Sequence, residues 1–227
     1  MTEPVKRRAY RSTVRAERAR ANRESILRAA RELFIANGYP HTSVAAVAAE
    51  AGVSEDLVYL HFKTKRRLLV EVLNYSVTGD VESPRVLEQE RPQAVRQEPD
   101  QRRQIALFAA DISGRTSRAR PIDDVMQSAA LVDPEIAEKH RAMHRTRLAN
   151  LTQLVEWIAA HGPLRDGLTV EDAAATVWAL TGPPMHRLLV DELGWDLDRF
   201  TAWVRETLES TLLPPLSPSR TDPDGPD

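Results

Sequence analysis

The residues best placed for metal chemistry are two histidines, His140 and His144, four positions apart. The apolar spacing around them indicates a helix, so both imidazoles lie on one face and could chelate a cation. The segment lacks the glutamate of the H-E-x-x-H zinc motif, and the sequence offers no obvious third ligand. A solvent-facing or core-satisfying pair is the favoured interpretation. We therefore expect no metal and no cofactor.

Catalytic constellations of other kinds are missing from the sequence. It contains no nucleophile–base set and no glycine-rich phosphate loop. It has no cysteine, which excludes disulfides and thiolate metal sites. We expect a protein that is not an enzyme; the enzyme alternative would require turnover that depends on His140 or His144.

Charge distribution favours recognition of nucleic acid. Residues 1–70 carry 14 Lys and Arg against 7 Asp and Glu, whereas residues 71–227 carry 17 against 26. A basic front joined to an acidic body suits one module that meets phosphates and one that does not. The charges could instead only keep each part soluble, but the basic part also contains the motif described next.

The stretch TSVAAVAAEAGVSEDLVYLHFKTKRRLL, residues 42–69, reads as two short helices joined by a tight turn. Thr42 is expected to cap the first helix and Ser54 the second, because each hydroxyl can accept a free backbone N–H. Gly52 supplies the positive φ that a sharp corner needs. Such a unit is a helix-turn-helix, whose second helix can lie in the major groove of DNA.

The rest of the chain also reads as helices, and no strand pattern is found. Apolar spacing and capping signals predict helices that begin near residues 22, 65, 100, 121, 134, 169 and 197. The segment 79–100 is polar and interrupted by prolines, so we expect a linker or a loosely ordered loop.

The predicted fold class is therefore all-α, with an N-terminal three-helix domain and a C-terminal helical domain. The expected parts are a flexible basic arm (1–20), a helix-turn-helix DNA-binding domain (21–65), a helical ligand-binding and dimerisation domain (66–213) and a disordered tail (214–227). No apolar run approaches the length of a membrane span, and the N-terminus lacks an apolar signal core. We expect a soluble cytoplasmic protein with no membrane partner.

The N-terminal module resembles the TetR family of bacterial transcriptional regulators over about residues 20–75. The resemblance rests on T-S-V-x-x-V-A at 42–48, A-G-V-S at 51–54 and Y-x-H-F-x-x-K at 59–65. The run LTGPPMHRLLVDELGWDLDRFTAWVRETL is similar to the last two helices of many members. The resemblance implies a homodimer in which three N-terminal helices bind a palindromic operator, middle helices enclose a ligand pocket, and the last two helices pair across the dimer.

The same resemblance implies which residues meet double-stranded DNA, some at phosphates and others at base edges. The expected set is Thr42, Ser43, Ser54, Glu55, Leu57, Tyr59, Leu60, His61, Lys63 and Lys65. Glu55 and Asp56 depart from the family pattern, which more often has basic or small residues there. Either carboxylate could accept a hydrogen bond from cytosine N4, and Leu60 could pack on a thymine methyl group. Each acid could instead serve only the N-terminus of its helix.

Pocket and dimer residues follow from the helices expected to surround each site. The expected pocket residues are Phe108, Met126, Met143, His144, Trp157 and Trp178, although each could be plain core. The C-terminal segment holds more apolar area than one short helix pair can hide, which favours a two-fold interface. The expected interface residues are Trp178, Leu189, Phe200, Trp203 and Val204.

The sequence thus predicts a DNA-binding transcriptional regulator, a repressor released from its palindromic operator by a small-molecule effector whose identity the sequence does not give. A DNA-binding protein that needs no ligand and uses the basic arm is the alternative. That alternative predicts steep salt dependence without sequence preference.

Overall fold

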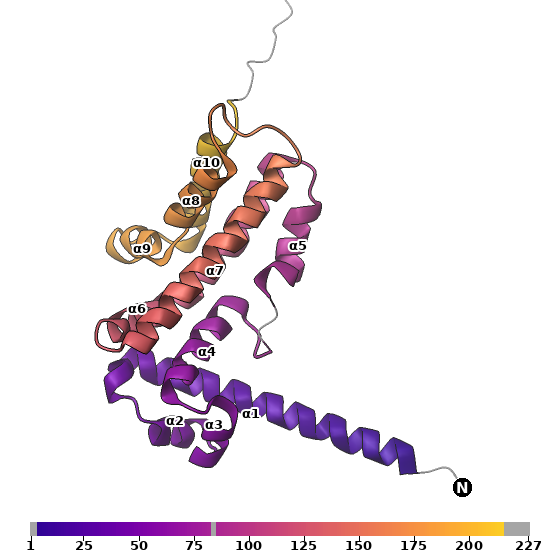
Figure 1. Cartoon of the computed structure of the whole chain (residues 1–227), viewed down its shortest axis with the longest axis vertical. Helices are drawn as coiled ribbons and strands as arrows, with labels where there is room; N and C mark the ends of the chain where they lie inside the picture. The colour runs from indigo at the N-terminus through magenta and orange to yellow at the C-terminus, as the bar shows by residue number, and fades with distance from the viewer. Residues whose placement is uncertain (1–3, 83–84, 216–227) are drawn as a thin grey trace, which may run out of the picture.

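The computed structural model describes residues 4–82 and 85–215, and every regular element in those ranges is helical (Figure 1). The predicted all-α fold class is confirmed. The elements are α1 (Pro4–His41), α2 (Val44–Ala51), α3 (Glu55–Phe62), α4 (Lys65–Thr78), the 3₁₀ helix η1 (Val86–Glu88), α5 (Glu90–Gln97), α6 (Gln101–Ala130), α7 (Pro134–Ala159), α8 (Val170–Leu180), α9 (Pro183–His186), the π-helical segment η2 (Arg187–Glu192) and α10 (Leu197–Leu212).

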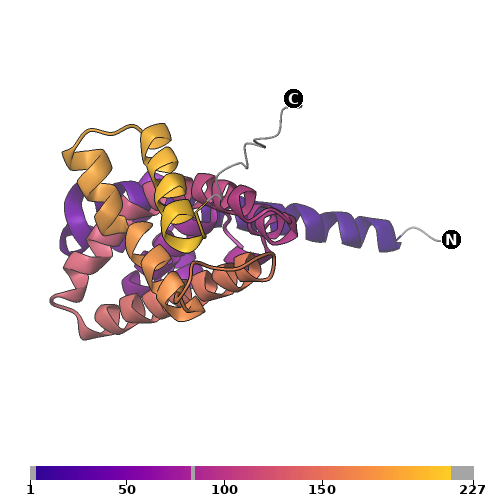
Figure 2. The same ribbon diagram turned by 90° about the horizontal axis from the view of Figure 1, so that it is seen from above.

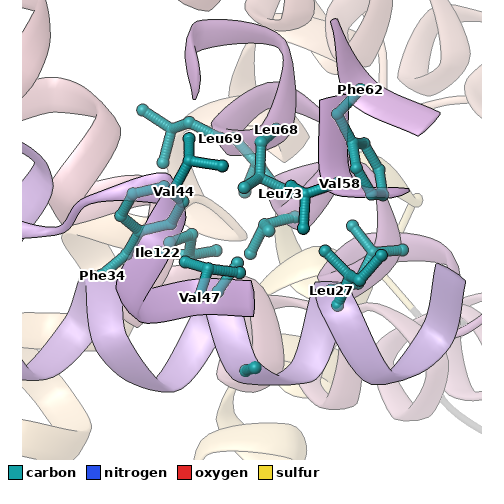
Figure 3. Packing of buried hydrophobic residues seen from close by; sticks show 14 of the residues in the cluster. Leu27, Phe34, Val44, Val47, Val58, Phe62, Leu68, Leu69, Leu73 and Ile122 are labelled. Carbon is teal, nitrogen blue, oxygen red and sulfur yellow. The ribbon is translucent and has the colours of Figure 1, made fainter. Parts of the chain in front are cut away.

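The helix-turn-helix module packs around one hydrophobic core to which α1, α2, α3 and α4 all contribute (Figure 3). The residues of this core recur at helical spacing on the inward faces of those helices. The largest fully buried side chains are Ile26, Leu27, Phe34, Phe62, Leu68 and Leu69. Ile122 of α6, which is fully buried, reaches into the same core from the body of the protein. The module is therefore not closed on itself, because a helix far along the chain completes it.

The body of the protein is a helical bundle above this module. The two long helices α6 and α7 lie side by side, with α8 and α10 packed against them (Figures 1 and 2). A second hydrophobic core fills the space between these helices, with Ile105, Val155, Val177 and Phe200 all fully buried. The N-terminal part of α1 projects away from both cores (Figure 2).

The expected flexible arm is corrected by the structure, in which residues 4–20 are the first part of α1. Pro4 stands at the helix start, where its missing N–H costs nothing, and the alanines and arginines that follow are good helix formers. Near its C-terminal end α1 is interrupted at Gly38, which has φ 76° and ψ 166°. Residues 1–3 of the arm and residues 216–227 of the predicted tail lie outside the described residues.

Two further expectations based on proline are wrong. The segment 79–100, predicted as a loop, contains α5. Pro92 lies in the first turn of this helix, where a backbone N–H would have no intrahelical acceptor, so the missing N–H of proline breaks no hydrogen bond. The predicted break before Pro121 is also missing, since α6 continues through this residue. Burial of Ala119 and Ile122 on either side of the proline holds the helix together across the lost hydrogen bond.

Capping residues largely follow the sequence signals. Ser54, Thr64, Asp133, Thr169 and Asp196 each accept a backbone N–H at the start of their helix, as predicted. Thr42 does not cap α2; Ser43 does, accepting from the backbone N–H of Ala46 at 3.0 Å. Among the described residues, no helix combines the length and the apolar character that crossing a bilayer requires.

Gly52 ends α2 in the left-handed conformation, with φ 67° and ψ 34°. We predict that Gly52→Ala lowers the free energy of unfolding by about 1 kcal/mol, because a Cβ disfavours the left-handed conformation. No atom lies within 4 Å of that Cβ, so the cost is conformational rather than steric.

Gly114 is the matched control, because it lies within α6 and does not have a positive φ. Gly114→Ala should raise stability by up to about 1 kcal/mol through helix propensity. Thermal and urea unfolding of both variants tests the pair. Equal effects of the two substitutions would remove the special role of Gly52.

Candidate DNA-binding face and ligand cavity

The turn between α2 and α3 is fixed by backbone hydrogen bonds and by a contact from α1. The Gly52 N–H donates to the Ala48 and Ala49 carbonyls, and the Val53 N–H donates to the Ala48 carbonyl at 3.0 Å. The Ser25 hydroxyl of α1 donates to the Ala51 carbonyl at 3.0 Å. These bonds set the direction in which α3 leaves the turn, so they set which side chains α3 presents outward.

The outward face of α3 and the two residues that flank this helix, Ser54 and Lys63, carry most of the residues expected to contact DNA. Exposed members of the expected set are Ser43, Ser54, Glu55, Tyr59, Leu60 and Lys63. Leu57, His61 and Lys65 are partly exposed. Leu60 is 64% exposed on this face. Val58 and Phe62 point the other way into the core.

Thr42 must be removed from the expected DNA contacts. Its side chain is only 1% exposed, and its hydroxyl donates to the Leu33 and Gly38 carbonyls at 3.0 and 2.9 Å. Both carbonyls belong to the end of α1, which Gly38 interrupts. Thr42 therefore stabilises the approach to α2, and its hydroxyl is not available to a phosphate.

Basic and acidic groups lie at opposite ends of α3. Glu55 and Asp56 occupy its first turn, where the helix dipole favours acids. Lys63 follows its last turn with φ 63°. Lys65 lies over the Tyr39 ring, 4.4 Å from its centroid, and its Nζ donates to the Pro40 carbonyl. A phosphate backbone would therefore meet its nearest lysines at the C-terminal end of α3.

His61 is expected to contact DNA as a neutral side chain. Burial lowers the pKa of its imidazole, and the nearby Arg23 guanidinium lowers it further. At neutral pH the ring can donate or accept a hydrogen bond, but it adds no positive charge.

A cavity of about 360 Å³ lies between α4, α5, α6 and α7. That volume is within the range of small-molecule sites. Four of the six expected pocket residues line it, namely Phe108, Met143, His144 and Trp157. Much of the remaining wall is apolar, including Leu73 and Val77 of α4 and Leu151 and Leu154 of α7.

Met126 and Trp178 do not line the cavity and are corrected. Met126 is fully buried in the core of the helix-turn-helix module, because it follows Ile122 by one turn on the same face of α6. Trp178 lies on the outside of α8 and is 37% exposed. Its ring still meets the edge of the His144 imidazole at a centroid distance of 5.8 Å.

Polar groups that the sequence analysis missed also line the cavity. Asp111 and Arg115 form a buried ion pair at 2.6 Å, and Arg115 donates to the Val77 carbonyl of α4 at 3.0 Å. Arg147 donates to the Trp178 carbonyl and to the Thr181 hydroxyl, and burial lowers its pKa to about 10. Spacing four apart marks Asp111 and Arg115 as a helical pair, but burial of that pair depends on tertiary packing.

Asp123 joins the predicted histidine pair in the cavity wall. The Nε2 atom of His140 lies 3.0 Å from Asp123 Oδ1 and 3.1 Å from His144 Nε2. All three side chains are partly buried. Burial lowers the pKa of His144, and the His140 ring acts in the same direction. Asp123 is on α6 and the histidines are on α7, so sequence spacing could not reveal the third group.

The expected dimer residues divide into two classes. Phe200 and Val204 are fully buried within the chain and cannot meet a partner, because they face α6 and α8 from the inner side of α10. Trp178, Leu189 and Trp203 remain partly or largely exposed. Leu188 and Leu193, which are 47% and 65% exposed, extend this apolar surface.

The helix-turn-helix module and the body are also joined by ion pairs at the turn between α6 and α7. Arg66 of α4 contacts Asp133 at 2.6 Å and Glu135 at 3.3 Å. The hydrogen bond to Arg66 lowers the pKa of Asp133. The α6–α7 connection therefore lies next to the start of α4, the helix that follows α3 in the chain.

Comparison with known proteins agrees with this arrangement. The family model described as bacterial regulatory proteins, tetR family, matches residues 26–72. The HTH-type transcriptional regulator QacR of Staphylococcus aureus is 42% identical over 52 residues, which are 23% of this chain and 28% of that protein. The curated relatives match about a quarter of this chain, and the chain spans well under two thirds of their length.

Solved structures extend the likeness of fold to the body. A TetR-family regulator from Rhodococcus sp. has a TM-score of 0.63 at 19% identity, over 85% of this chain and 98% of that one. The regulator FadR of Bacillus subtilis, in complex with stearoyl-CoA, has a TM-score of 0.60 at 20% identity, over 82% and 96%. The N-terminal module thus matches the tetR family model in sequence, and most of the chain resembles solved TetR-family regulators in fold.

Proposed function

We propose that this protein is a cytoplasmic transcriptional repressor that binds a palindromic operator as a homodimer and is released by a small molecule bound in its cavity. The observation that carries the proposal is the placement of α4. Leu68 and Leu69 of this helix belong to the helix-turn-helix core, while Leu73 and Val77 line the cavity. A ligand that moves α4 would therefore move the DNA-binding face.

The effector site is the cavity between α4 and α7. Its apolar wall and few polar groups suit a small molecule with a hydrophobic portion. A solved relative of the same fold holds stearoyl-CoA, which supports ligand binding by bodies of this shape. Release from DNA would follow if the ligand prefers the arrangement in which the two reading helices do not match the operator.

The homodimer would use the apolar surface of α8, η2 and α10. Trp178, Leu188 and Leu193 are exposed there, and Trp203 is partly exposed. Exposed apolar area of this kind is usually covered by a partner. A two-fold pairing would place two copies of α3 to read successive major grooves.

Selection of bound DNA from a random pool at physiological salt tests the proposed function directly. The purified full-length protein should enrich a palindrome with two half-sites about one helical turn apart. Enrichment of no sequence, together with steep salt dependence, would instead support the ligand-independent binder that uses charge alone.

Glu55 is the residue expected to read sequence from the acidic tip of α3. We predict that Glu55→Ala changes base preference at one position of each half-site, by about tenfold, while total affinity changes less. Asp56→Ala is the matched control, because Asp56 is exposed in the same turn but is expected to serve the helix N-terminus. Quantitative binding to a panel of operator variants measures both. An unchanged preference in Glu55→Ala removes this residue from base reading.

Arg66 is expected to transmit the state of the body to the DNA-binding module. We predict that Arg66→Ala changes the effect of an effector on operator affinity by about threefold or more, because the contacts with Asp133 and Glu135 are lost. The comparison is operator affinity with and without a releasing compound found by screening. Arg67→Ala is the control, since Arg67 contacts Glu71 of its own helix. If the compound changes operator affinity equally in both variants, the Arg66 contact does not transmit the effect of ligand binding to the DNA-binding module.

A further inference from the structure

Three ligand atoms converge on one point of the cavity wall, from Asp123 of α6 and from His140 and His144 of α7. These atoms all lie within 4.8 Å of one another. His140 Nε2 is central, 3.0 Å from the carboxylate and 3.1 Å from the other imidazole. The two histidines are one helical turn apart, so their side chains project from the same face of α7.

Neutral rings give this arrangement at most one proton on His140 Nε2, which has two polar neighbours within hydrogen-bond distance. A protonated His140 Nε2 has no lone pair left, so it can donate to Asp123 but cannot accept from His144. An unprotonated His140 Nε2 can accept from His144, but it then faces the Asp123 carboxylate with no proton between them. One cation at the common point would satisfy all three atoms at once.

The separations also suit coordination of a transition metal. Imidazole nitrogens bind such ions at about 2.0–2.1 Å, which places neighbouring ligand atoms about 3.0 Å apart in octahedral and about 3.4 Å apart in tetrahedral geometry. The two separations that involve His140 Nε2, 3.0 and 3.1 Å, fall in this range, and the Asp123 and His144 atoms lie within 4.8 Å of each other. Two imidazoles and one carboxylate favour zinc, nickel, cobalt, copper or iron over magnesium or calcium.

We propose that Asp123, His140 and His144 bind a divalent transition-metal ion whose remaining coordination positions face the effector cavity. Three protein ligands leave room for water or for a donor atom of a bound molecule. Arg147 lines the same cavity as the three side chains, so positive charge is already present beside the site. A molecule that completes the coordination shell would therefore be favoured if its donor atom is anionic, such as a carboxylate or phenolate oxygen.

An ion at this point would also join α6 to α7. Asp123 and His140 stand on either side of the α6–α7 turn, whose Asp133 and Glu135 contact Arg66 of the DNA-binding module. The proposal that a metal binds depends only on the geometry of the three side chains. Any effect of the metal on operator release rests in addition on the proposed function.

The test uses the full-length protein without a polyhistidine tag, stripped with a chelator and titrated with Zn²⁺, Ni²⁺ or Co²⁺ by calorimetry. We expect one ion per chain. With Co²⁺ we also expect a visible absorption spectrum typical of an ion coordinated by nitrogen atoms. His144→Gln and Asp123→Asn should each weaken binding by at least about tenfold. His161→Ala is the control, because His161 is exposed and contacts only the Trp157 carbonyl among the described residues.

Circular dichroism of the stripped variants checks that each is folded, and the two single-ligand variants provide independent tests if one is not. Absence of binding by the stripped wild-type protein at micromolar concentrations of all three ions would overturn the proposal. Equal binding by wild-type and both ligand variants would also overturn it, since the ion would then lie elsewhere. DNA selection in the presence of a chelator is scored separately, so failure of the metal site and failure of the DNA-binding proposal are distinguishable.

Discussion

The packing of Ile122 and its neighbours on α6 into the core of the helix-turn-helix module is the constraint on which the rest of the structure depends. A module of three short helices buries little apolar area alone, and here α4 and α6 complete it. The DNA-facing helix thus takes its position from the same helices that enclose the cavity. Because packed cores shift between discrete arrangements, we expect a shift of α6 to move α3.

Polar contacts refine this coupling. Arg66 ties the start of α4 to the α6–α7 turn, and Arg115 ties the end of α4 to the middle of α6. The helix that separates the DNA-binding face from the cavity is therefore held at both ends by the body. The cluster of Asp123, His140 and His144 lies between these two ties and bridges α6 to α7.

Sequence reasoning succeeded where the signal is local. Ser54 precedes two acids at a helix start, Gly52 stands where a corner needs positive φ, and Asp133-Pro134 is a strong start signal, so each could be placed without a structure. The exposed face of α3 followed from the same periodicity that placed Val58 in the core.

Sequence reasoning failed where tertiary packing decides. Thr42 and Ser43 are chemically similar, and only the position of the α1 end directs the Thr42 hydroxyl inward. Phe200 and Trp203 are three residues apart, yet only the first is covered by the bundle. Asp123 is 17 residues from His140, and only the antiparallel packing of α6 and α7 brings the two together.

Amide hydrogen exchange of an Ile122→Val variant tests whether α6 completes the core of the DNA-binding module. Removing one methylene there should cost about 1 kcal/mol and should speed exchange in α2 and α3 as well as in α6. Ile158→Val is the matched control, because Ile158 is equally buried but belongs to the second core. We expect faster exchange in α2 and α3 for Ile122→Val alone. Faster exchange confined to α6 and α7 in both variants would contradict it.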